Sequence, residues 1–296
     1  MKHRWTLKTR DLTRTDQPLL MGILNVTPDS FSDGGQFQLV ENAVARALQM
    51  EADGADIIDI GGESTRPGAQ PVALDEELRR TIPVIRELAA RIRIPISIDT
   101  AKADVARQAL EAGAEIVNDI SGLTFDPDML EVCRLHDAGI CLMHIQGTPQ
   151  TMQKNPTYAD VVKEVTEFLQ QQVDRCLMAG ILPERMSVDP GIGFGKTAEQ
   201  NFDLLGRLAD LQSLACPILV GLSRKSMLGE VTGKPTNERL SASVVAAVLA
   251  ADRGAHIVRV HDVAETRDGL SVWRALPRAC SMRRQSSTAV AWPDDE

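Results

Sequence analysis

The sequence predicts a single closed (β/α)8 barrel, and three features of the 296-residue chain lead to this fold. First, about eight apolar segments have the length of a strand, and an amphipathic segment of helix length follows each of them. Second, a unit of helix, glycine and strand recurs along the chain. Third, the strand-like segments do not alternate polar and apolar residues, which is typical of parallel strands buried on both faces. Eight such units favour a closed barrel over an open doubly wound sheet, with the active site at the C-terminal face of the strands.

The repeat is clearest at Gly54, Gly113 and Gly254, and a looser copy begins at Gly139. Each glycine follows a helical stretch and precedes a strand rich in β-branched residues. Glycine adopts the left-handed conformation that often ends a helix, so each should lie at a helix C-terminus.

The expected elements follow in chain order. The predicted strands cover residues 19–24, 57–59, 95–98, 116–118, 139–143, 186–188, 217–220 and 257–259. The predicted helices cover residues 40–53, 74–91, 103–112, 127–137, 158–179, 198–213, 237–253 and 264–276. Pro83 should kink the second helix, and Asp126 and Thr197 are predicted N-caps.

Three parts of the chain are distinguished. Residues 1–18 should form an N-terminal extension, residues 19–277 the barrel, and residues 278–296 a flexible tail. The extension and the tail are expected to be ragged at their ends.

Composition excludes several classes of protein. The chain is 43% hydrophobic and 25% charged with a net charge of -9, which argues against a nucleic-acid surface. The longest apolar run, 244–251, is far shorter than the roughly 18 to 20 residues that a membrane span needs. The N-terminus lacks the apolar block of a secretory signal. The cysteines are odd in number and scattered, so we expect reduced thiols in a cytoplasmic protein: Cys133, Cys141, Cys176, Cys216 and Cys280.

Polar residues stand at the carboxyl end of nearly every predicted strand. They are Asn25, Asp59, Asp99, Asn118, His144, Asp189, Ser223 with Arg224 and Lys225, and Arg259 with His261. One Asp in such a place is most often a helix cap. Eight strand ends that meet at one mouth instead favour a binding site.

Two subsets of these residues differ in chemistry. The carboxylates and amide of Asp99, Asn118 and Asp189 suit a flat heterocycle with several N–H donors. A second subset of cations and imidazole suits a phosphate or pyrophosphate, and comprises Arg66, Lys225, Arg259 and His261.

Other motifs favour simpler interpretations. The segment 188–197, VDPGIGFGKT, ends like a phosphate-binding loop, but Pro190 stands where the first glycine is required. Its glycines more plausibly bring a loop close to a flat ligand, with Phe194 beside it. His144 has no second His or Cys at metal-ligand spacing, so a structural or supporting role is favoured over metal binding. Ser223 lacks the glycines of a nucleophile elbow.

Eight motifs in order resemble those of the dihydropteroate synthases, the folate-pathway enzymes that sulfonamides target. They are MGILNVTPDSFSDGG at 21–35, DIGGESTRPGA at 59–69, SIDT at 97–100, VNDISG at 117–122, LMHIQGTPQTMQ at 142–153, VDPGIGFGK at 188–196, GLSRKS at 221–226 and RVHDV at 259–263. The resemblance covers roughly residues 19–276. It implies that (7,8-dihydropterin-6-yl)methyl diphosphate and 4-aminobenzoate are joined to 7,8-dihydropteroate with release of pyrophosphate.

The resemblance also implies roles for matching residues. The pterin would be held by Asp99, Asn118, Asp189 and Lys225, with Met143 and Phe194 lining its pocket. The diphosphate would lie against Asn25, Thr65, Arg66, Arg259 and His261, and Asn25 would contact Mg2+. The aminobenzoate would be bound by Phe31, Thr65, Pro67 and Ser223 once the loops at 25–37 and 62–72 close. Catalysis would rest on Lys225, Arg66 and Asp99, the chain would form a homodimer, and sulfonamides would be inhibitors.

Three alternatives stay open. A pterin-binding methyltransferase of the same superfamily would share Asp99, Asn118 and Asp189 but has little use for a diphosphate clamp. A phosphosugar isomerase or aldolase would need a base or a Schiff-base lysine, for which Lys225 is the one candidate. A non-catalytic pterin-binding paralogue is the third.

Overall fold

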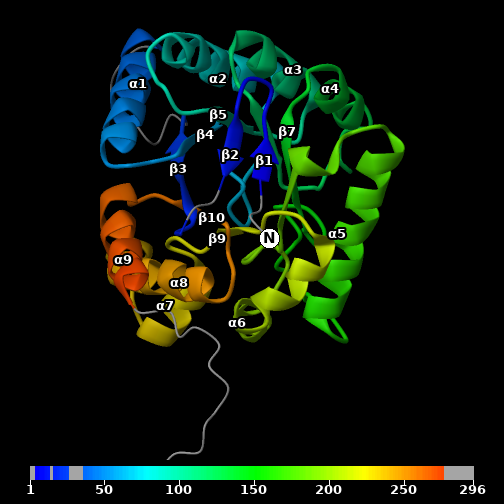
Figure 1. The fold of residues 1–296 in the computed structure, drawn as a ribbon, viewed down its shortest axis with the longest axis vertical. Helices are drawn as coiled ribbons and strands as arrows, with labels where there is room; N and C mark the ends of the chain where they lie inside the picture. Colours follow the sequence, from blue (N-terminus) through cyan, green and yellow to red (C-terminus); the bar gives the residue numbers. More distant parts are fainter. Residues whose placement is uncertain (1–3, 14–15, 27–35, 277–296) are drawn as a thin grey trace, which may run out of the picture.

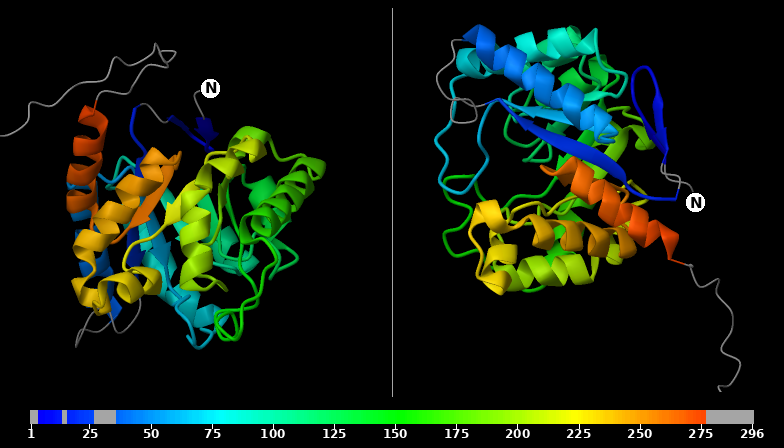
Figure 2. Two further views of the ribbon diagram at one scale, coloured as in Figure 1. Left: turned by 90° about the horizontal axis from the view of Figure 1, so that it is seen from below. Right: turned by 90° about the vertical axis from the view of Figure 1, so that its left-hand side faces the viewer.

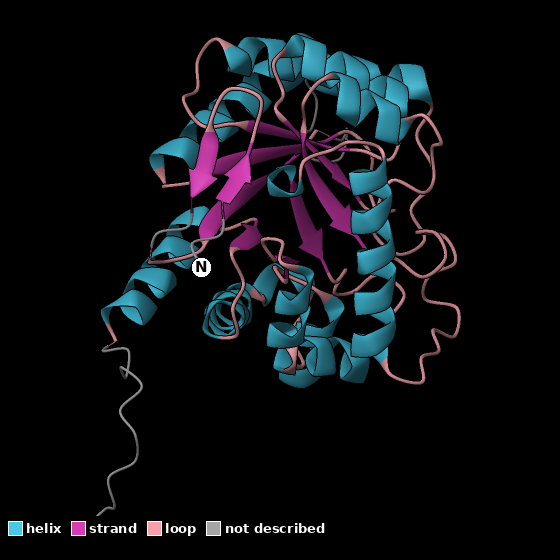
Figure 3. Ribbon diagram, turned by 45° about the vertical axis from the view of Figure 1, so that its right-hand side comes forward, coloured by secondary structure: helices cyan, strands magenta, loops and turns pink. Residues whose placement is uncertain are grey.

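Eight parallel strands close into a barrel at the centre of the molecule, with helices outside (Figures 1 and 3). This computed structural model describes residues 4–13, 16–26 and 36–276. The strands of the barrel are β3 (Leu19–Asn25), β4 (Ile57–Gly61), β5 (Ile96–Asp99), β6 (Ile116–Asp119), β7 (Gly139–Met143), β8 (Met186–Asp189), β9 (Leu219–Gly221) and β10 (Ile257–Val260). They are hydrogen-bonded in the order β8-β7-β6-β5-β4-β3-β10-β9, and a parallel bridge between Val188 and Ile218 closes the ring. The predicted (β/α)8 barrel is therefore confirmed.

The helices follow the predicted series with two differences. They are α1 (Gln36–Ala52), α2 (Leu74–Ala89), α3 (Ala103–Ala112), α4 (Met129–Leu135), α5 (Val161–Met178), α6 (Ala198–Gly206), α7 (Ser226–Thr232), α8 (Leu240–Asp252) and α9 (Val263–Ala275). The predicted helix 198–213 changes at Arg207 from α6 to a 3-10 helix, Leu208–Leu214. The seven-residue α7 was not predicted.

Three of the four repeat glycines end helices as predicted. Gly54, Gly113 and Gly254 have φ of 96°, 119° and 99°, in the left-handed region that favours glycine. Gly139 serves another purpose, because it begins β7 and a Cβ there would overlap the side chain of Leu7.

An N-terminal hairpin covers the end of the barrel at which the strands begin. Its strands, β1 (Arg4–Thr6) and β2 (Asp11–Thr13), pair antiparallel. Trp5 and Leu7 are buried in one apolar cluster with strand residues that include Met21 and Ile57. The sequence did not predict this hairpin, whose buried side chains close an apolar surface that the strands alone leave open. Figure 2 shows the hairpin at one end and the loops at 62–73 and 144–160 at the other.

Helix caps and ion pairs fix the helices around the barrel. Thr197 and Gln200 form the predicted capping box of α6. Asp126 is not the N-cap of α4; its carboxylate instead accepts from the backbone N–H of Ala103, at the start of α3, at 2.8 Å. That prediction was wrong because α4 begins later, at Met129.

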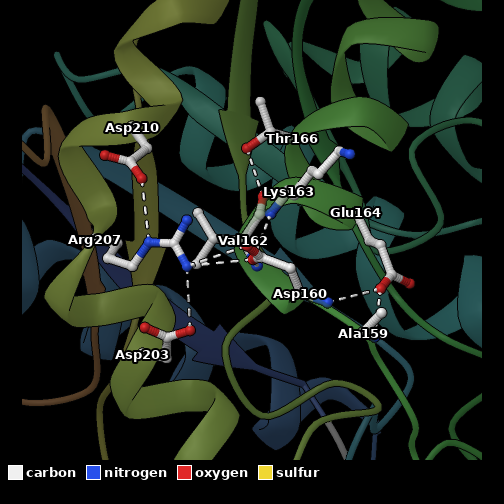
Figure 4. Close-up of polar contacts among 9 residues, drawn as sticks. All are labelled: Ala159, Asp160, Val162, Lys163, Glu164, Thr166, Asp203, Arg207 and Asp210. Atoms are coloured by element: carbon white, nitrogen blue, oxygen red, sulfur yellow. Dashed lines mark hydrogen bonds and ion pairs between the residues drawn. The ribbon is translucent and has the colours of Figure 1, made fainter.

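Arg207 ties the end of α6 to the start of α5 (Figure 4). Its guanidinium lies 3.2 Å from Asp160, 3.5 Å from Asp203 and 3.2 Å from Asp210. Asp160 is the N-cap of α5 and accepts from two backbone N–H groups of its first turn. Because these side chains are close to half exposed, the ion pairs order the helix ends more than they stabilise the fold.

Other sequence-based expectations are answered in part. No helix within residues 4–13, 16–26 and 36–276 is long and apolar enough to cross a membrane. Cys133, Cys141, Cys176 and Cys216 are buried free thiols, as predicted. Cys280 and the predicted tail 278–296 lie outside the described residues. The cytoplasmic location stays a prediction.

Candidate active site

Strand register brings the predicted polar residues to one level of the barrel. Asn25 is paired with Gly61, Gly61 with Asp99, and Asp99 with Asn118. Further round the ring, Met143 is paired with Asp189. Neighbouring strand ends are therefore level, and their polar side chains converge at the C-terminal mouth of the barrel.

Arg259 connects two buried carboxylates, Asp59 and Asp99, inside this mouth. Its Nε donates to Asp59 at 2.6 Å, and its Nη2 donates to Asp99 at 2.7 Å. Asp59 also accepts from the Nδ2 of Asn118 at 3.1 Å. The sequence suggested that cations and carboxylates occupy separate subsites, but Arg259 lies between two carboxylates and joins the subsets.

Burial controls the charge of Asp99. Loss of water contact raises the pKa of the Asp99 carboxyl to about 7, against the opposing effect of Arg259. The negative charges of Asp59, Glu77 and Asp119 raise this pKa further. Among the described residues, Asp99 Oδ1 is buried without a hydrogen-bond partner. This oxygen is an acceptor that a ligand could use.

Asp189 and Lys225 form the opposite side of the mouth. Asp189 accepts from the backbone N–H of Gly191 at 2.7 Å, and burial raises its pKa while Lys225 opposes the rise. Burial likewise lowers the pKa of Lys225 to about 8, and Asp189 limits this change. Lys225 Nζ donates to the carbonyl of Ile192 and lies 4.6 Å from the centre of the Phe194 ring.

The loop after β8 is held from behind by Lys196. This lysine is 2% exposed, and its Nζ donates to the carbonyls of Gly191 at 2.9 Å and Phe194 at 3.0 Å. The Nδ1 of His144 lies 3.0 Å from the same Nζ. Lys196, which made segment 188–197 resemble a phosphate-binding loop, therefore supports its own loop from the interior. The sequence analysis did not predict this role.

His144 has the structural role that was favoured over metal binding. Burial, aided by the charge of Lys196, lowers its pKa to about 3, so the imidazole is neutral at pH 7. Its ring packs edge-on against Phe168, with the centroids 5.0 Å apart. These contacts leave it as a support for the loop after β7.

An apolar cluster lies beside these polar residues. Met143 belongs to one buried cluster with Ile120, Ile145 and Met152, and Phe194 packs against it. The two predicted lining residues, Met143 and Phe194, are thus brought together. Such a wall beside buried acceptors suits a flat ring.

Ser223 and His261 form a hydrogen-bonded pair at the rim. Ser223 Oγ lies 2.9 Å from His261 Nδ1. Burial, followed by the charges of Arg259 and Arg224, lowers the pKa of His261 to about 4. Arg66 lowers this pKa further, which places its charge within electrostatic reach of His261. At pH 7 His261 is therefore a neutral hydrogen-bonding group.

The loop after β4 is docked on the loop after β7. Gly68 donates its N–H to the carbonyl of Pro149 at 2.9 Å, and Gln150 Nε2 donates to the carbonyl of Ala69 at 3.1 Å. Within this loop Thr65 is half-buried, while Arg66 and Pro67 are exposed. Phe31 and the rest of the segment 27–35 lie outside the described residues, so closure of the first loop stays a prediction.

The amide oxygen of Asn25 is a ligand type that Mg2+ takes, so this residue is compatible with a magnesium ion whose other ligands come from outside the chain. Asn25 Oδ1 lies 3.8 Å from the position that a Cβ would take at Gly61. Asp99 Oδ2 lies 3.7 Å from the same position, but it already accepts from Arg259. Within the described ranges no three His, Cys, Asp or Glu side chains group into a metal site. Mg2+ commonly takes few protein ligands together with phosphate oxygens and water, so this donor set is compatible with it.

The comparisons with known proteins all indicate the same family. The family model described as "Pterin binding enzyme" matches residues 21–261. The dihydropteroate synthase of Synechocystis is 55% identical over 245 residues, 82% of this chain and 85% of that protein. Two crystal structures of dihydropteroate synthases are also similar. That of Xanthomonas albilineans with 4-aminobenzoic acid has 47% identity, a TM-score of 0.87, and coverage of 94% of this chain and 100% of that chain. That of Yersinia pestis with a sulfonamide drug complex has 45% identity, a TM-score of 0.86, and coverage of 92% and 98%.

The loop after β8 yields a first prediction. Gly191 has φ of 67°, and a Cβ there would overlap the carbonyl oxygen of His144. Gly180 has φ of 86° with nothing within 4 Å of its Cβ position, so it is a matched control. Gly180→Ala should lower the free energy of unfolding by about 1 to 2 kcal/mol through backbone strain alone. Gly191→Ala should cost a further 1 to 3 kcal/mol or so through overlap.

Urea denaturation of both variants measures the difference. Equal losses for Gly191→Ala and Gly180→Ala would show that the loop does not need its close approach to His144.

Proposed function

The chain belongs to the dihydropteroate synthases of the pterin-binding enzyme family, and from this membership and the pocket we propose how its residues divide the reaction. Enzymes of this family are transferases that join (7,8-dihydropterin-6-yl)methyl diphosphate to 4-aminobenzoate, forming a C–N bond and releasing pyrophosphate. The proposal rests on one observation above all: buried carboxylates and an amide converge beside an apolar wall at the mouth of the barrel.

The heterocycle binds in the deep part of the mouth. Asp99, Asn118 and Asp189 offer acceptor oxygens to the N–H groups of the ring, and Lys225 offers a donor to its carbonyl. Support comes from the buried, unpartnered Oδ1 of Asp99 among the described residues. Met143 and Phe194 form the apolar wall against the ring.

The diphosphate binds nearer to solvent, at Arg66, His261 and Thr65. Neutral His261 donates a hydrogen bond rather than a full charge, and exposed Arg66 supplies the charge. Arg259 contributes through Nη1, because Nε and Nη2 are committed to Asp59 and Asp99. Arg259 thus links the ring subsite to the leaving group.

Mg2+ bound to the diphosphate would be held by the amide oxygen of Asn25. It would supply positive charge to the departing pyrophosphate. The cation stays a proposal that the Asn25 oxygen near Gly61 supports.

The aminobenzoate binds at the rim, at Thr65, Pro67 and Ser223; Phe31, which lies outside the described residues, is assigned to the same subsite by the resemblance alone. Ser223 is also the hydrogen-bond partner of His261, so it lies at the boundary with the diphosphate subsite. Sulfonamides that mimic the aminobenzoate would occupy the same place. The similarity to a relative solved with 4-aminobenzoic acid supports this assignment.

The chemistry needs positioning and electrostatics more than a base. The aromatic amine is already a neutral nucleophile, and the difficult step is the departure of pyrophosphate from a methylene carbon that then shares positive charge with the ring. Asp99 and Asp189 stabilise that charge, while Arg66, Arg259 and His261 stabilise the anion that leaves. Closure of the loops at 25–37 and 62–72 would hold the amine in line and exclude water.

A groove on the outside of the barrel supports the proposal of a homodimer. It lies between α6, α7 and α8 and is lined by residues that include Phe202, Leu228 and Leu249. Val231 and Val245 in this groove are 64% and 57% exposed. We assign a second copy of the chain as the partner that covers this apolar surface.

The reaction is tested by pyrophosphate release. Release should require both the pterin diphosphate and 4-aminobenzoate, should fall when divalent cations are chelated, and should recover with Mg2+. Release at the same rate without 4-aminobenzoate would mean that the pterin diphosphate is hydrolysed, and no release with both substrates would favour a methyltransferase or a non-catalytic pterin-binding protein. Either result would contradict the proposal.

Asp189→Asn should weaken pterin binding by about 1.5 to 3 kcal/mol, because one charged acceptor is lost. Calorimetry measures this change, and an unchanged pterin affinity would remove Asp189 from its role.

Asp99 predicts a pH dependence. Its raised pKa of about 7 means that the accepting carboxylate form gains population as the pH rises from 6 to 7.5. Calorimetry with a pterin that lacks the diphosphate and does not titrate in this range should show binding strengthening by about tenfold. Asp99→Asn should remove most of this dependence. If the variant keeps the same slope, another group is responsible.

The oligomer is tested by sedimentation. The wild-type chain should be a dimer, and Val245→Asp should give monomers because a charge would be buried at the interface. Val272→Asp is the control, since Val272 is 70% exposed on α9 outside the groove. A monomeric wild type at micromolar concentration would refute the assignment.

A further inference from the structure

Asp59 is a carboxylate that contacts two residues of the mouth directly, yet the division of roles above assigns it nothing. It is fully buried in β4, with 0% exposure. The sequence placed it among the strand-end residues, yet neither the resemblance nor the comparisons give it a function. Burying an ionised carboxylate is costly, so its retention there calls for a reason.

Both contacts of Asp59 lead to residues of the proposed pterin and diphosphate subsites. Its Oδ2 accepts from Arg259 Nε at 2.6 Å and from Asn118 Nδ2 at 3.1 Å. Asp59 is therefore placed to act through its neighbours.

The contact to Asn118 sets the direction of an amide. Because Nδ2 is committed to Asp59, the Oδ1 of Asn118 lies on the other side of the amide and is free to accept from a ligand. A flipped amide would place its oxygen against the Asp59 carboxylate, which is unfavourable. Asp59 thus makes Asn118 an acceptor toward the ring.

The contact to Arg259 sets the plane of a guanidinium. Asp59 and Asp99 bind two different nitrogens of Arg259, and two charge-assisted bonds fix such a planar group in one orientation. Two carboxylates share one cation, so the trio carries one net negative charge when both acids are ionised. Asp59 therefore keeps Arg259 from being an exclusive partner of Asp99.

The surroundings of Asp59 argue against a purely stabilising role. Among the described residues, its Oδ1 and the Oγ of the adjacent Ser97 are buried without hydrogen-bond partners. A buried ion pair with an unsatisfied oxygen is a poor source of stability, and an apolar core would serve better. Polar groups left in this state are typical of functional sites.

We propose that Asp59 is a positioning residue that orients Asn118 and Arg259 before the pterin substrate binds, without touching either substrate itself. The inference rests on the proposed function and adds a residue to it. Removing the charge of Asp59 should loosen the ring subsite while leaving the aminobenzoate subsite unchanged.

The first test compares Asp59→Asn with Asp56→Asn. Asp56 precedes the same strand at the opposite end of the barrel, where it accepts from the N–H of Leu20 at 2.8 Å. Asp59→Asn should weaken binding of a diphosphate-free pterin about tenfold or more, because a charge-assisted contact becomes neutral. It should leave the KM for 4-aminobenzoate unchanged, and Asp56→Asn should change neither quantity. Equal pterin affinities for the two variants would overturn the inference.

A double-mutant cycle separates positioning from general damage. In an Asn118→Ala background, the effect of Asp59→Asn on pterin affinity should shrink at least threefold or so, because one of its two routes is gone. Fully additive effects would mean that Asp59 does not act through Asn118. If wild-type protein itself fails to bind the pterin, the proposed function fails; if only the cycle is additive, the inference fails alone.

Hydrogen exchange on the intact wild-type chain keeps the inference testable should Asp59→Asn not fold. The Arg259 Nε–H and Asn118 Nδ2–H groups should exchange slowly in the ligand-free protein, since Asp59 already holds them. Slow exchange that arises only after the pterin binds would show that Asp59 does not orient these groups in advance.

Discussion

One guanidinium shared between two buried carboxylates organises the mouth of this barrel. Arg259 reaches from β10 to Asp59 on β4 and to Asp99 on β5, and so connects strands that are not neighbours in the sheet. In a low-dielectric interior such contacts are strong and directional. Asn118 joins through the same Asp59 oxygen, so the donors and acceptors that a flat ring would meet are arranged before any ligand arrives.

The rest of the fold keeps this network dry and rigid. Trp5 and Leu7 of the hairpin cover the end of the barrel at which the strands begin. An apolar layer that includes Met21 and Ile57 lies between the hairpin and the polar residues of the mouth. At the mouth, Lys196 secures the loop that carries Phe194. The pKa shifts at Asp99, Lys225 and His261 share burial as their largest cause, so the barrel tunes its charges mainly by excluding water.

The sequence predicted the barrel and most of the mouth, because both depend on short-range patterns. Helix-glycine-strand units specify the fold, and parallel strands bring their carboxyl ends together whatever the distance along the chain. Besides the short α7, three features at the two ends of the barrel escaped prediction. The hairpin strands have only three residues each, which is too short for a recognisable period. The Lys196 side chain points inward, and Arg259 lies between Asp59 and Asp99. Both placements depend on the register of several strands, which no local sequence pattern encodes.

The most direct measurement is a crystal structure of the chain with a non-reactive analogue of the pterin diphosphate. The account predicts the ring against Asp99, Asn118 and Asp189, the diphosphate at Arg66 and His261, and Arg259 still bridging Asp59 and Asp99. A ring bound elsewhere, or an Arg259 that abandons both carboxylates for the diphosphate, would contradict it.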